Sequence, residues 1–223
     1  MPTALALAFA QMPDPRFKRV IWRAAGWSVV LLAVLVILAW WALDGLVVAG
    51  MPWVDTFVAV LGKAAAVVLA LVLFPAAALL VVSFFLEDIV RAVEARHYPG
   101  LAAPRVQPPG ELAASALRLV TLSAVLNLLV LPLYLIPVIN LFVFYGLNGY
   151  LLGREYFELV AGRRMEPAAV RTTWRARRAR LYLAGVVIAV LMSIPLVNWL
   201  MPVPSAAFMA HVFESMRQKG LAS

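Results

Sequence analysis

The chain has 223 residues, of which 65% are apolar and 13% are charged, and its net charge is +8. Soluble domains have roughly a quarter charged residues, so this composition excludes a water-soluble globular protein and requires that lipid cover much of the exterior. The chain has no cysteine, and His97 and His211 lack a metal-binding spacing, so we expect no disulfide, no metal and no cofactor. Long unbroken apolar runs indicate membrane helices rather than the strands of a barrel.

Residues 1–23 are predicted to form a cytoplasmic interfacial segment. The first twelve residues, MPTALALAFAQM, are apolar but follow no basic residue, which favours a short interfacial helix over an uncleaved signal-like anchor. Four basic residues against one aspartate then give the segment a net charge of +3. These residues are Arg16, Lys18, Arg19 and Arg23, with Asp14.

Two uncharged stretches have the length that a bilayer crossing requires. Residues 24–43 predict a first transmembrane helix, with tryptophans near its ends where interfacial aromatic residues belong. Residues 64–97 predict a second transmembrane helix with a cytoplasmic extension. The loop between them, 44–63, has a net charge of −1, and a linker rich in proline and glycine follows the second helix.

Two later regions, 111–153 and 181–213, contain apolar runs that are too long for one crossing and too short for two. The uncharged run from Leu119 to Gly153 would measure about 52 Å as one helix, against a hydrocarbon core of ~30 Å. Both runs contain proline and asparagine near the middle. The sequence therefore predicts two helical hairpins that penetrate the membrane partway, with short tilted crossings as the alternative.

The two hairpins share the pattern I-P-apolar-apolar-N at their predicted turns. Pro137 and Asn140 form the first turn in this interpretation, and Pro195 and Asn198 form the second. Internal repeats are common in transporters, whose sites lie near repeat interfaces. Turn and capping chemistry also explains these prolines and asparagines.

Residues 154–180 form a basic segment, with eight arginines and three glutamates and hence a net charge of +5. Short basic segments stay on the cytoplasmic side of a membrane. We therefore predict that both termini and residues 154–180 are cytoplasmic and that residues 44–63 are outside. The whole chain, 1–223, is interpreted as a single all-α domain of the bacterial inner membrane.

Arginines within the basic segment are candidates for anion binding. On one helix, Arg171, Arg175 and Arg178 would share a face, and guanidinium forks suit tetrahedral oxyanions and lipid phosphates. A topology signal that contacts acidic headgroups explains the same cluster. The location of the basic residues in short loops favours these interpretations over nucleic-acid binding.

A second candidate for anion binding is the start of the first transmembrane helix. Arg16, Lys18 and Arg19 follow Pro15, so cationic side chains would stand beside the free amide groups of a helix start. An orientation signal explains the same residues.

The sequence shows no enzyme motif: it lacks GxSxG, a P-loop and a GxGxxG before a helix. The acids Glu87, Asp88 and Glu94 are interpreted as a solvated helix face, because Arg91 and other arginines lie close in sequence. We therefore predict that the protein is not an enzyme.

The C-terminal half resembles CysZ-type sulfate permeases, a family shared with etoposide-induced-protein-like membrane proteins. The resemblance rests on the segment from Ser193 to Ala207, SIPLVNWLMPVPSAA, on the arginine pattern from Arg171 to Arg177, and on the acidic and aromatic patch from Glu155 to Glu158. At the N-terminus, Lys18 and Arg19 keep the charge of the family's Gly-apolar-Arg anion motif, while Arg16 stands where that motif has glycine.

The resemblance implies an oligomeric sulfate permease or channel that supports sulfur assimilation, with two long spanning helices and two partly penetrating hairpins. Sulfate or a related oxyanion, membrane lipid and further copies of the chain are then the expected partners. The alternative is a non-transporting membrane scaffold or acidic-lipid-binding protein that uses its arginines on headgroups.

Overall fold

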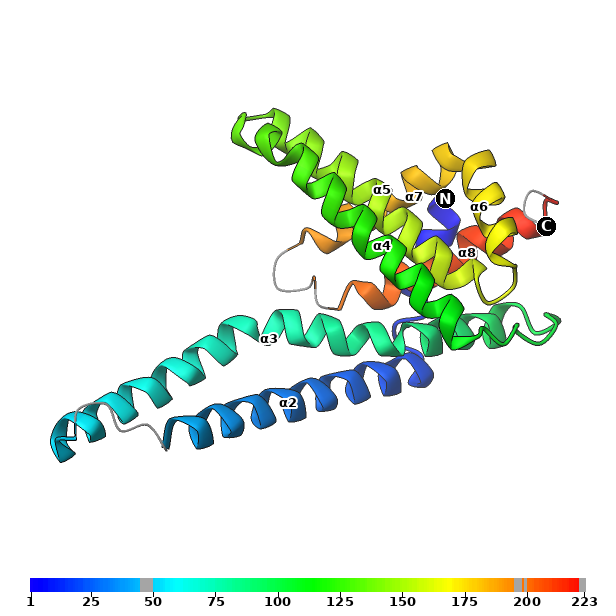
Figure 1. Cartoon of the computed structure of the whole chain (residues 1–223). Helices are drawn as coiled ribbons and strands as arrows, with labels where there is room; N and C mark the ends of the chain where they lie inside the picture. Colours follow the sequence, from blue (N-terminus) through cyan, green and yellow to red (C-terminus); the bar gives the residue numbers. More distant parts are fainter. Residues whose placement is uncertain (45–49, 195–197, 199, 221–223) are drawn as a thin grey trace. The chain divides into compact units, whose positions relative to one another are not determined.

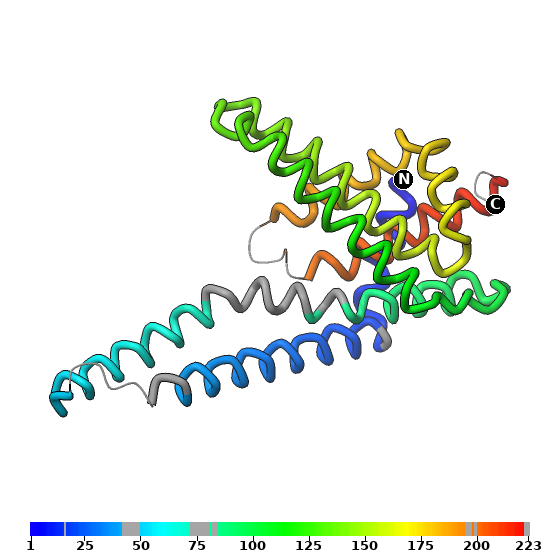
Figure 2. The backbone as a smooth tube through the Cα atoms, in the orientation of Figure 1, coloured from blue at the N-terminus to red at the C-terminus, as the bar shows by residue number. Residues whose placement is uncertain are grey.

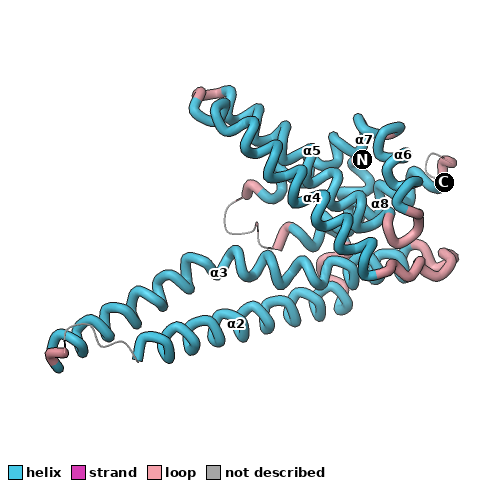
Figure 3. The backbone as a smooth tube through the Cα atoms, in the orientation of Figure 1, coloured by secondary structure: helices cyan, strands magenta, loops and turns pink. Residues whose placement is uncertain are grey.

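The computed structural model describes residues 1–44, 50–194, 198 and 200–220, and within these the side chains of all but 16, 42–44, 72–80 and 82–83. The described chain is helical apart from short connections (Figure 3). In chain order the elements are α1 (Pro2–Ala10), α2 (Pro15–Asp44), α3 (Pro52–His97), α4 (Pro109–Val130), the 3-10 helix η1 (Leu131–Leu135), α5 (Ile139–Ala161), α6 (Pro167–Ala176), α7 (Arg178–Met192) and α8 (Pro202–Arg217) (Figure 1).

Three helical stretches are long and apolar enough to cross a membrane: Phe17–Trp41, Pro52–Leu71 and Pro109–Leu135. These stretches confirm the prediction of an all-α membrane protein. The predicted start of the second helix, residue 64, was wrong. Helix α3 begins at Pro52, so the second half of the predicted 44–63 loop is helical. Pro52 occupies the first helical position, where its missing N–H has no cost, and Asp55 lies in the first turn.

Contacts divide the described chain into two compact units, residues 18–85 and residues 1–17 with 86–223. The single membrane domain predicted from the sequence stays a prediction. In the unit of residues 18–85, α2 and the first part of α3 lie alongside each other (Figure 2). Their tryptophans are highly exposed, with 78% of Trp41 and 74% of Trp53 accessible, which suits side chains that face lipid and its interface.

The unit of residues 1–17 and 86–223 is built around α8. Every residue of α8 from Pro202 to Glu214 is buried, and α1, α5 and α7 pack against it. Helix α1 is fixed to α8 by a hydrogen bond of 2.6 Å between Gln11 Nε2 and His211 Nε2. The predicted interfacial segment is thus helical, as expected, and one side of it is docked on protein.

The first predicted hairpin is present as α4, η1 and α5, which lie side by side and are joined at one end (Figure 1). Pro137 lies in the turn. The next residue, Val138, has a φ of +69°, an uncommon conformation for a β-branched residue. Asn140 lies in the first turn of α5 and makes no capping hydrogen bond, so the expectation that it caps the helix was wrong.

The second predicted hairpin, 181–213, corresponds to α7 and α8, which contact each other. Helix α7 has 15 residues and is about 22 Å long, less than the ~30 Å of a hydrocarbon core. Asn198 lies in a turn, and its carbonyl accepts a hydrogen bond from the Met201 amide; Pro195 lies outside the described residues. The second arm is a buried helix of the protein core and extends to Arg217.

Helices α5 and α7 approach each other through glycines. A Cβ atom added at Gly185 of α7 would lie 1.9 Å from the carbonyl oxygen of Gly149 and 2.5 Å from the amide nitrogen of Gly153. Gly149 and Gly153 form a GxxxG pattern on α5, which permits close packing of membrane helices. This contact fixes the two helices that carry most of the site described next.

Candidate anion-binding site

A cavity of about 570 Å³ lies among α4, α5, α6 and α7. Five arginines line it, together with three aromatic residues and one acid. Its lining residues are Arg118, Tyr150, Arg154, Glu158, Arg171, Trp174, Arg175, Arg178, Ala179 and Tyr182. We refer to this cavity as the arginine pocket.

The hairpin topology brings two of these arginines together. Arg118 and Arg154 border the uncharged run 119–153, one at each end. Because the run folds back on itself as α4 and α5, its two ends meet, and both arginines line the pocket. The pocket therefore lies where the uncharged run of the hairpin gives way to charged sequence.

The remaining arginines come from two helices, not from one. Arg171, Arg175 and Arg178 were predicted to share the face of a single helix, but α6 ends at Ala176 and Arg177 has a non-helical conformation, with φ −117° and ψ 22°. Arg178 therefore begins α7, which the glycine contact holds against α5. All three side chains still line one cavity.

Aromatic side chains position α6 against α5. The indole ring of Trp174 meets the ring of Tyr150 edge-on, with 5.8 Å between the ring centroids, and lies 6.0 Å from the ring of Phe157. Trp174 and Phe157 are buried. The sequence pattern that places a tryptophan between arginines thus serves packing, and it holds Arg171 and Arg175 at the rim of the cavity.

Four of the five arginines have no partner among the described residues. Arg118, Arg171, Arg175 and Arg178 are exposed, and they make no side-chain hydrogen bond or ion pair with any residue that the structure describes. A guanidinium has five N–H donors, so the cavity presents many unused donors to one space. Such an array suits a ligand that is rich in acceptor oxygens and negatively charged.

Arg154 differs from the other four because it is buried and paired. Its Nε donates to Glu158 Oε1 at 2.8 Å, and its Nη1 donates to the Tyr150 hydroxyl at 3.4 Å. Burial by itself would lower the pKa of the Arg154 guanidinium, but the hydrogen bond and charge of Glu158, with a smaller effect of Tyr150, raise this pKa above its ordinary value. The side chain therefore stays charged.

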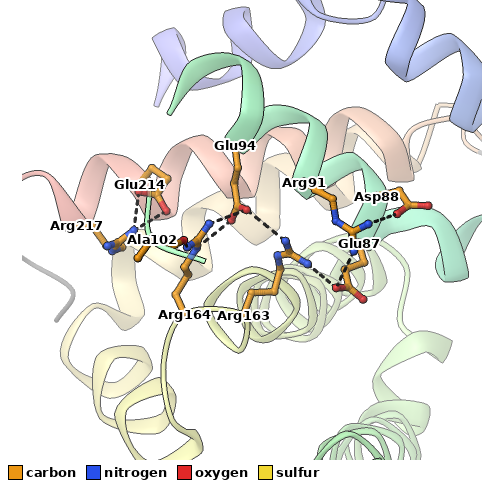
Figure 4. Close-up of polar contacts among 9 residues, drawn as sticks. All are labelled: Glu87, Asp88, Arg91, Glu94, Ala102, Arg163, Arg164, Glu214 and Arg217. Atoms are coloured by element: carbon orange, nitrogen blue, oxygen red, sulfur yellow. Dashed lines mark hydrogen bonds and ion pairs between the residues drawn. The ribbon is translucent and has the colours of Figure 1, made fainter. Parts of the chain in front are cut away.

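In a second arginine-rich cluster of the same unit, each arginine contacts a carboxylate (Figure 4). Arg163 bridges Glu87 and Glu94, and Arg164 contacts Glu94 at 2.8 Å and also donates to the Ala102 carbonyl. The prediction that Glu94 lies on a solvated helix face was wrong, because its side chain is 8% exposed and both of these arginines reach it. We call this cluster the paired network.

The predicted N-terminal cations lie at the start of α2. Lys18 and Arg19 are exposed in its first turns, and the side chain of Arg16 lies outside the described residues. The arginine pocket is lined by other residues. These cations remain a predicted anion contact of the α2 start.

Two pocket arginines were missed by the sequence reasoning, Arg118 and Arg154. The available signal was their position as the charged residues that bound the uncharged run 119–153. A hairpin must bring such residues together. Among the residues that the structure describes, no three histidine or acidic side chains group as metal ligands.

The fold and the pocket define a class of protein: a helical membrane protein with a cationic cavity beside its hairpin. The chain belongs to the family of sulfate transporter CysZ and etoposide-induced protein 2.4, whose family model matches residues 4–202. The matched range contains every residue that lines the arginine pocket. No curated protein matches the chain. The family is one of transporter-type membrane proteins and confirms the resemblance seen in the sequence.

Proposed function

We propose that this protein is an inorganic-oxyanion permease of the bacterial inner membrane, that it supplies sulfate to sulfur assimilation, and that the arginine pocket is its anion-binding site. One observation carries the proposal: four guanidinium groups, unpaired within the described part of the chain, line a single cavity in a member of a sulfate-transporter family. Five arginines against one glutamate give the lining a strong positive charge, which raises the local concentration of anions.

The chemistry of the pocket suits a tetrahedral oxyanion. Guanidinium groups bind such anions through pairs of parallel N–H···O bonds, which are shorter and stronger than bonds between neutral groups. The unpaired side chains are exposed and keep their solvent, so an incoming ion exchanges water for guanidinium donors without breaking an ion pair of the protein. Binding of this kind is reversible, as permeation requires.

We place Lys18 and Arg19 at a second anion contact, at the start of α2. Their exposed side chains stand beside the free backbone amides of a helix start, where the helix dipole also favours an anion. We also propose that the protein forms a homo-oligomer.

An acidic-lipid-binding scaffold is the second candidate function, and one feature of α4 favours it. Leu117 and Val120, next to Arg118, are 69% and 65% exposed, so apolar and cationic side chains adjoin at the pocket. Basic pockets between membrane helices bind phosphate-bearing headgroups. This candidate predicts binding to acidic vesicles without passage of an ion.

The test is flux of radiolabelled sulfate into liposomes of neutral lipid that contain the purified protein. We expect saturable uptake by the wild type and its loss in the triple variant Arg171→Ala, Arg175→Ala, Arg178→Ala. The control is Arg91→Ala, which removes an exposed arginine outside the pocket. Absence of wild-type uptake, together with pocket-dependent flotation on acidic vesicles, would show that the lipid-binding scaffold is the correct function.

The orientation of the proposed permease follows from its charge pattern. Net charges of +3 before the first span and +5 in 154–180 should hold both termini in the cytoplasm. Fusion of a reporter that is active only in the cytoplasm to the C-terminus should therefore give signal. A reporter that is active only outside the cytoplasm should give none, and the reverse pattern would contradict this orientation.

A further inference from the structure

A second cationic cavity lies between α1 and α8, and it shares no lining residue with the arginine pocket. Its volume is about 160 Å³. The lining comes from α1, from the residue that follows α3, from the first turn of α7, and from α8 with the residues after it. Its polar residues are Thr3, Tyr98, Arg180, His211, Ser215 and Lys219. We call this cavity the α1–α8 pocket.

The α1–α8 pocket contains a guanidinium group that has no carboxylate. Arg180 is half-buried, and its Nη2 donates to Ser215 Oγ at 2.8 Å. The Ser215 hydroxyl in turn donates to the Val212 carbonyl, so the guanidinium is held by a neutral group. Lys219 adds a second positive charge, and no acid is among the described residues of the lining. Because a guanidinium that leaves water is usually compensated by an anion, an anionic ligand is the partner that this position lacks.

The hydrogen bonds of His211 leave a further donor free in the pocket. Gln11 Nε2 lies 2.9 Å from the Leu7 carbonyl oxygen, which fixes the orientation of the amide, and 2.6 Å from His211 Nε2. His211 Nε2 therefore accepts, and the ring proton lies on Nδ1, which donates to the Tyr98 hydroxyl oxygen at 2.8 Å. Burial, with a smaller effect of His97, lowers the pKa of His211 to about 4, so the ring is neutral. The proton of the Tyr98 hydroxyl is then available to a ligand.

The start of α1 supplies backbone donors to the same pocket. Helix α1 has nine residues and begins at Pro2, so the amides of Thr3 and Ala4 lie in its first turn and have no acceptor within the helix. Both residues line the pocket. The helix dipole also places partial positive charge at this end. The pocket thus combines two cationic side chains, a phenolic proton and helix-start amides, and every one of these groups donates.

We propose that the α1–α8 pocket is a second anion-binding site, which takes a small, fully deprotonated oxyanion such as sulfate as a free ion and thereby holds α1 on α8. Sulfate oxygens only accept hydrogen bonds, which matches a lining that offers donors and no carboxylate. The site lies on the predicted cytoplasmic side of the membrane. It goes beyond the proposed function, because none of its residues belongs to the arginine pocket.

The experiment measures hydrogen–deuterium exchange of the purified full-length protein in nanodiscs of neutral lipid, titrated with sodium sulfate. We expect sulfate to slow the exchange of the α1 amides, because the bound ion contacts α1 and α8 together. Arg180→Gln should raise the sulfate concentration of half-maximal protection about tenfold or more, since a charge-assisted contact is lost. Lys219→Gln should raise it about two- to fivefold. Lys219 is exposed, so this second variant tests the site without disturbing the packing of α8.

Three controls make the result specific. Sodium chloride of the same ionic strength should protect α1 much less than sulfate does. Arg91→Gln removes an exposed arginine that lines neither cavity and should leave the half-maximal concentration unchanged. The triple variant of the arginine pocket should keep the protection of α1 as well, so a failure of the permease and a failure of this second site are distinguishable.

Two outcomes would overturn the inference. Equal protection by sulfate and chloride would show a general effect of salt, and unchanged titrations in both Arg180→Gln and Lys219→Gln would place the ion elsewhere. A separate arm omits sulfate and adds an acidic phospholipid to the nanodisc. Protection of α1 in that arm alone would contradict the free ion, because the pocket would then take a lipid headgroup.

Discussion

The paired network and the arginine pocket are two arginine clusters of one compact unit, and they differ in the burial and the pairing of their guanidinium groups. In the paired network, Arg163 and Arg164 are 4% and 7% exposed, and each contacts a carboxylate (Figure 4). In the pocket, Arg118, Arg171, Arg175 and Arg178 are exposed, and none of them meets a carboxylate of a described residue. Arginine-rich sequence is thus used in two distinct ways.

The reason for the difference is the cost of removing charge from water. A buried guanidinium without a partner loses its hydration, and no ion pair or hydrogen bond compensates for that loss. Buried arginines are therefore found with carboxylates. An arginine on an open cavity keeps its water and needs no partner, which leaves its donors available to a ligand. Pairing therefore indicates a structural role for the network, and the lack of pairing among the described residues is the reason why we propose the pocket as the binding site.

The largest expected effect is on the paired network. Glu94→Ala leaves the buried Arg164 without a carboxylate and Arg163 with Glu87 as its one remaining carboxylate among the described residues. Breaking a buried ion pair in this way costs about 3–5 kcal/mol of unfolding free energy. Chemical unfolding in detergent, followed by circular dichroism, measures the loss. Arg175→Ala, in the pocket, should remain within about 0.5 kcal/mol of the wild type, as substitutions at exposed positions do. Equal losses of unfolding free energy in Glu94→Ala and Arg175→Ala would contradict the assignment of a structural role to the paired network alone.

A test of unpaired cations outside the pocket uses the start of α2. Lys18→Ala with Arg19→Ala should weaken sulfate binding by about ten- to hundredfold if these side chains make charge-assisted contacts with the ion. Equilibrium binding measures the change, and detergent chromatography checks that the oligomer size is unaffected.

The membrane orientation of this double variant must be verified as well, since Arg16 and Arg23 would be left to hold the N-terminus inside. A correctly inserted variant with unchanged sulfate affinity would show that unpaired cations alone, without a cavity, do not make an anion site.

A third prediction concerns the contact that holds the pocket together. Gly185→Ala places a methyl group on the backbone of Gly149 and Gly153 and forces α7 away from α5, which should lower the unfolding free energy by about 1–3 kcal/mol. Anion affinity should fall with it, because Arg154 and Arg178 lie on these two helices.

The control for this substitution is Gly26→Ala in α2. Nothing lies within 4 Å of the added Cβ atom there, so the unfolding free energy should rise by up to about 1 kcal/mol through the better helix propensity of alanine. An equal effect of the two substitutions would mean that α5 and α7 do not need their glycine contact.

The smallest expected effect is on sulfate affinity, in a variant that keeps the positive charge of the pocket but changes the geometry of one donor group. Arg175→Lys keeps the positive charge but removes the planar fork that binds two oxygens at once, so sulfate affinity should fall about five- to tenfold, with no change in unfolding free energy. Competition binding measures the change. If lysine serves as well as arginine, the pocket acts only through its positive potential.

The sequence by itself determined the membrane class, the presence of the two long helices, the hairpin at Pro137 and the family. These features depend on local quantities: the length of uncharged runs, the positions of proline and the motif around Pro195 and Asn198. Arg171, Arg175 and Arg178 were also visible as candidate anion ligands, because a dense arginine run is a property of sequence alone.

Only the tertiary structure decided which arginines are available. Arg163 and Arg171 lie in the same basic segment, yet Arg163 is buried against Glu87 and Glu94, whereas Arg171 stands unpaired on a cavity. Its pocket also includes Arg118, which comes from a distant part of the chain. Pairing and burial depend on partners supplied by other helices, and the free energy of a charge depends on those partners and on its access to water.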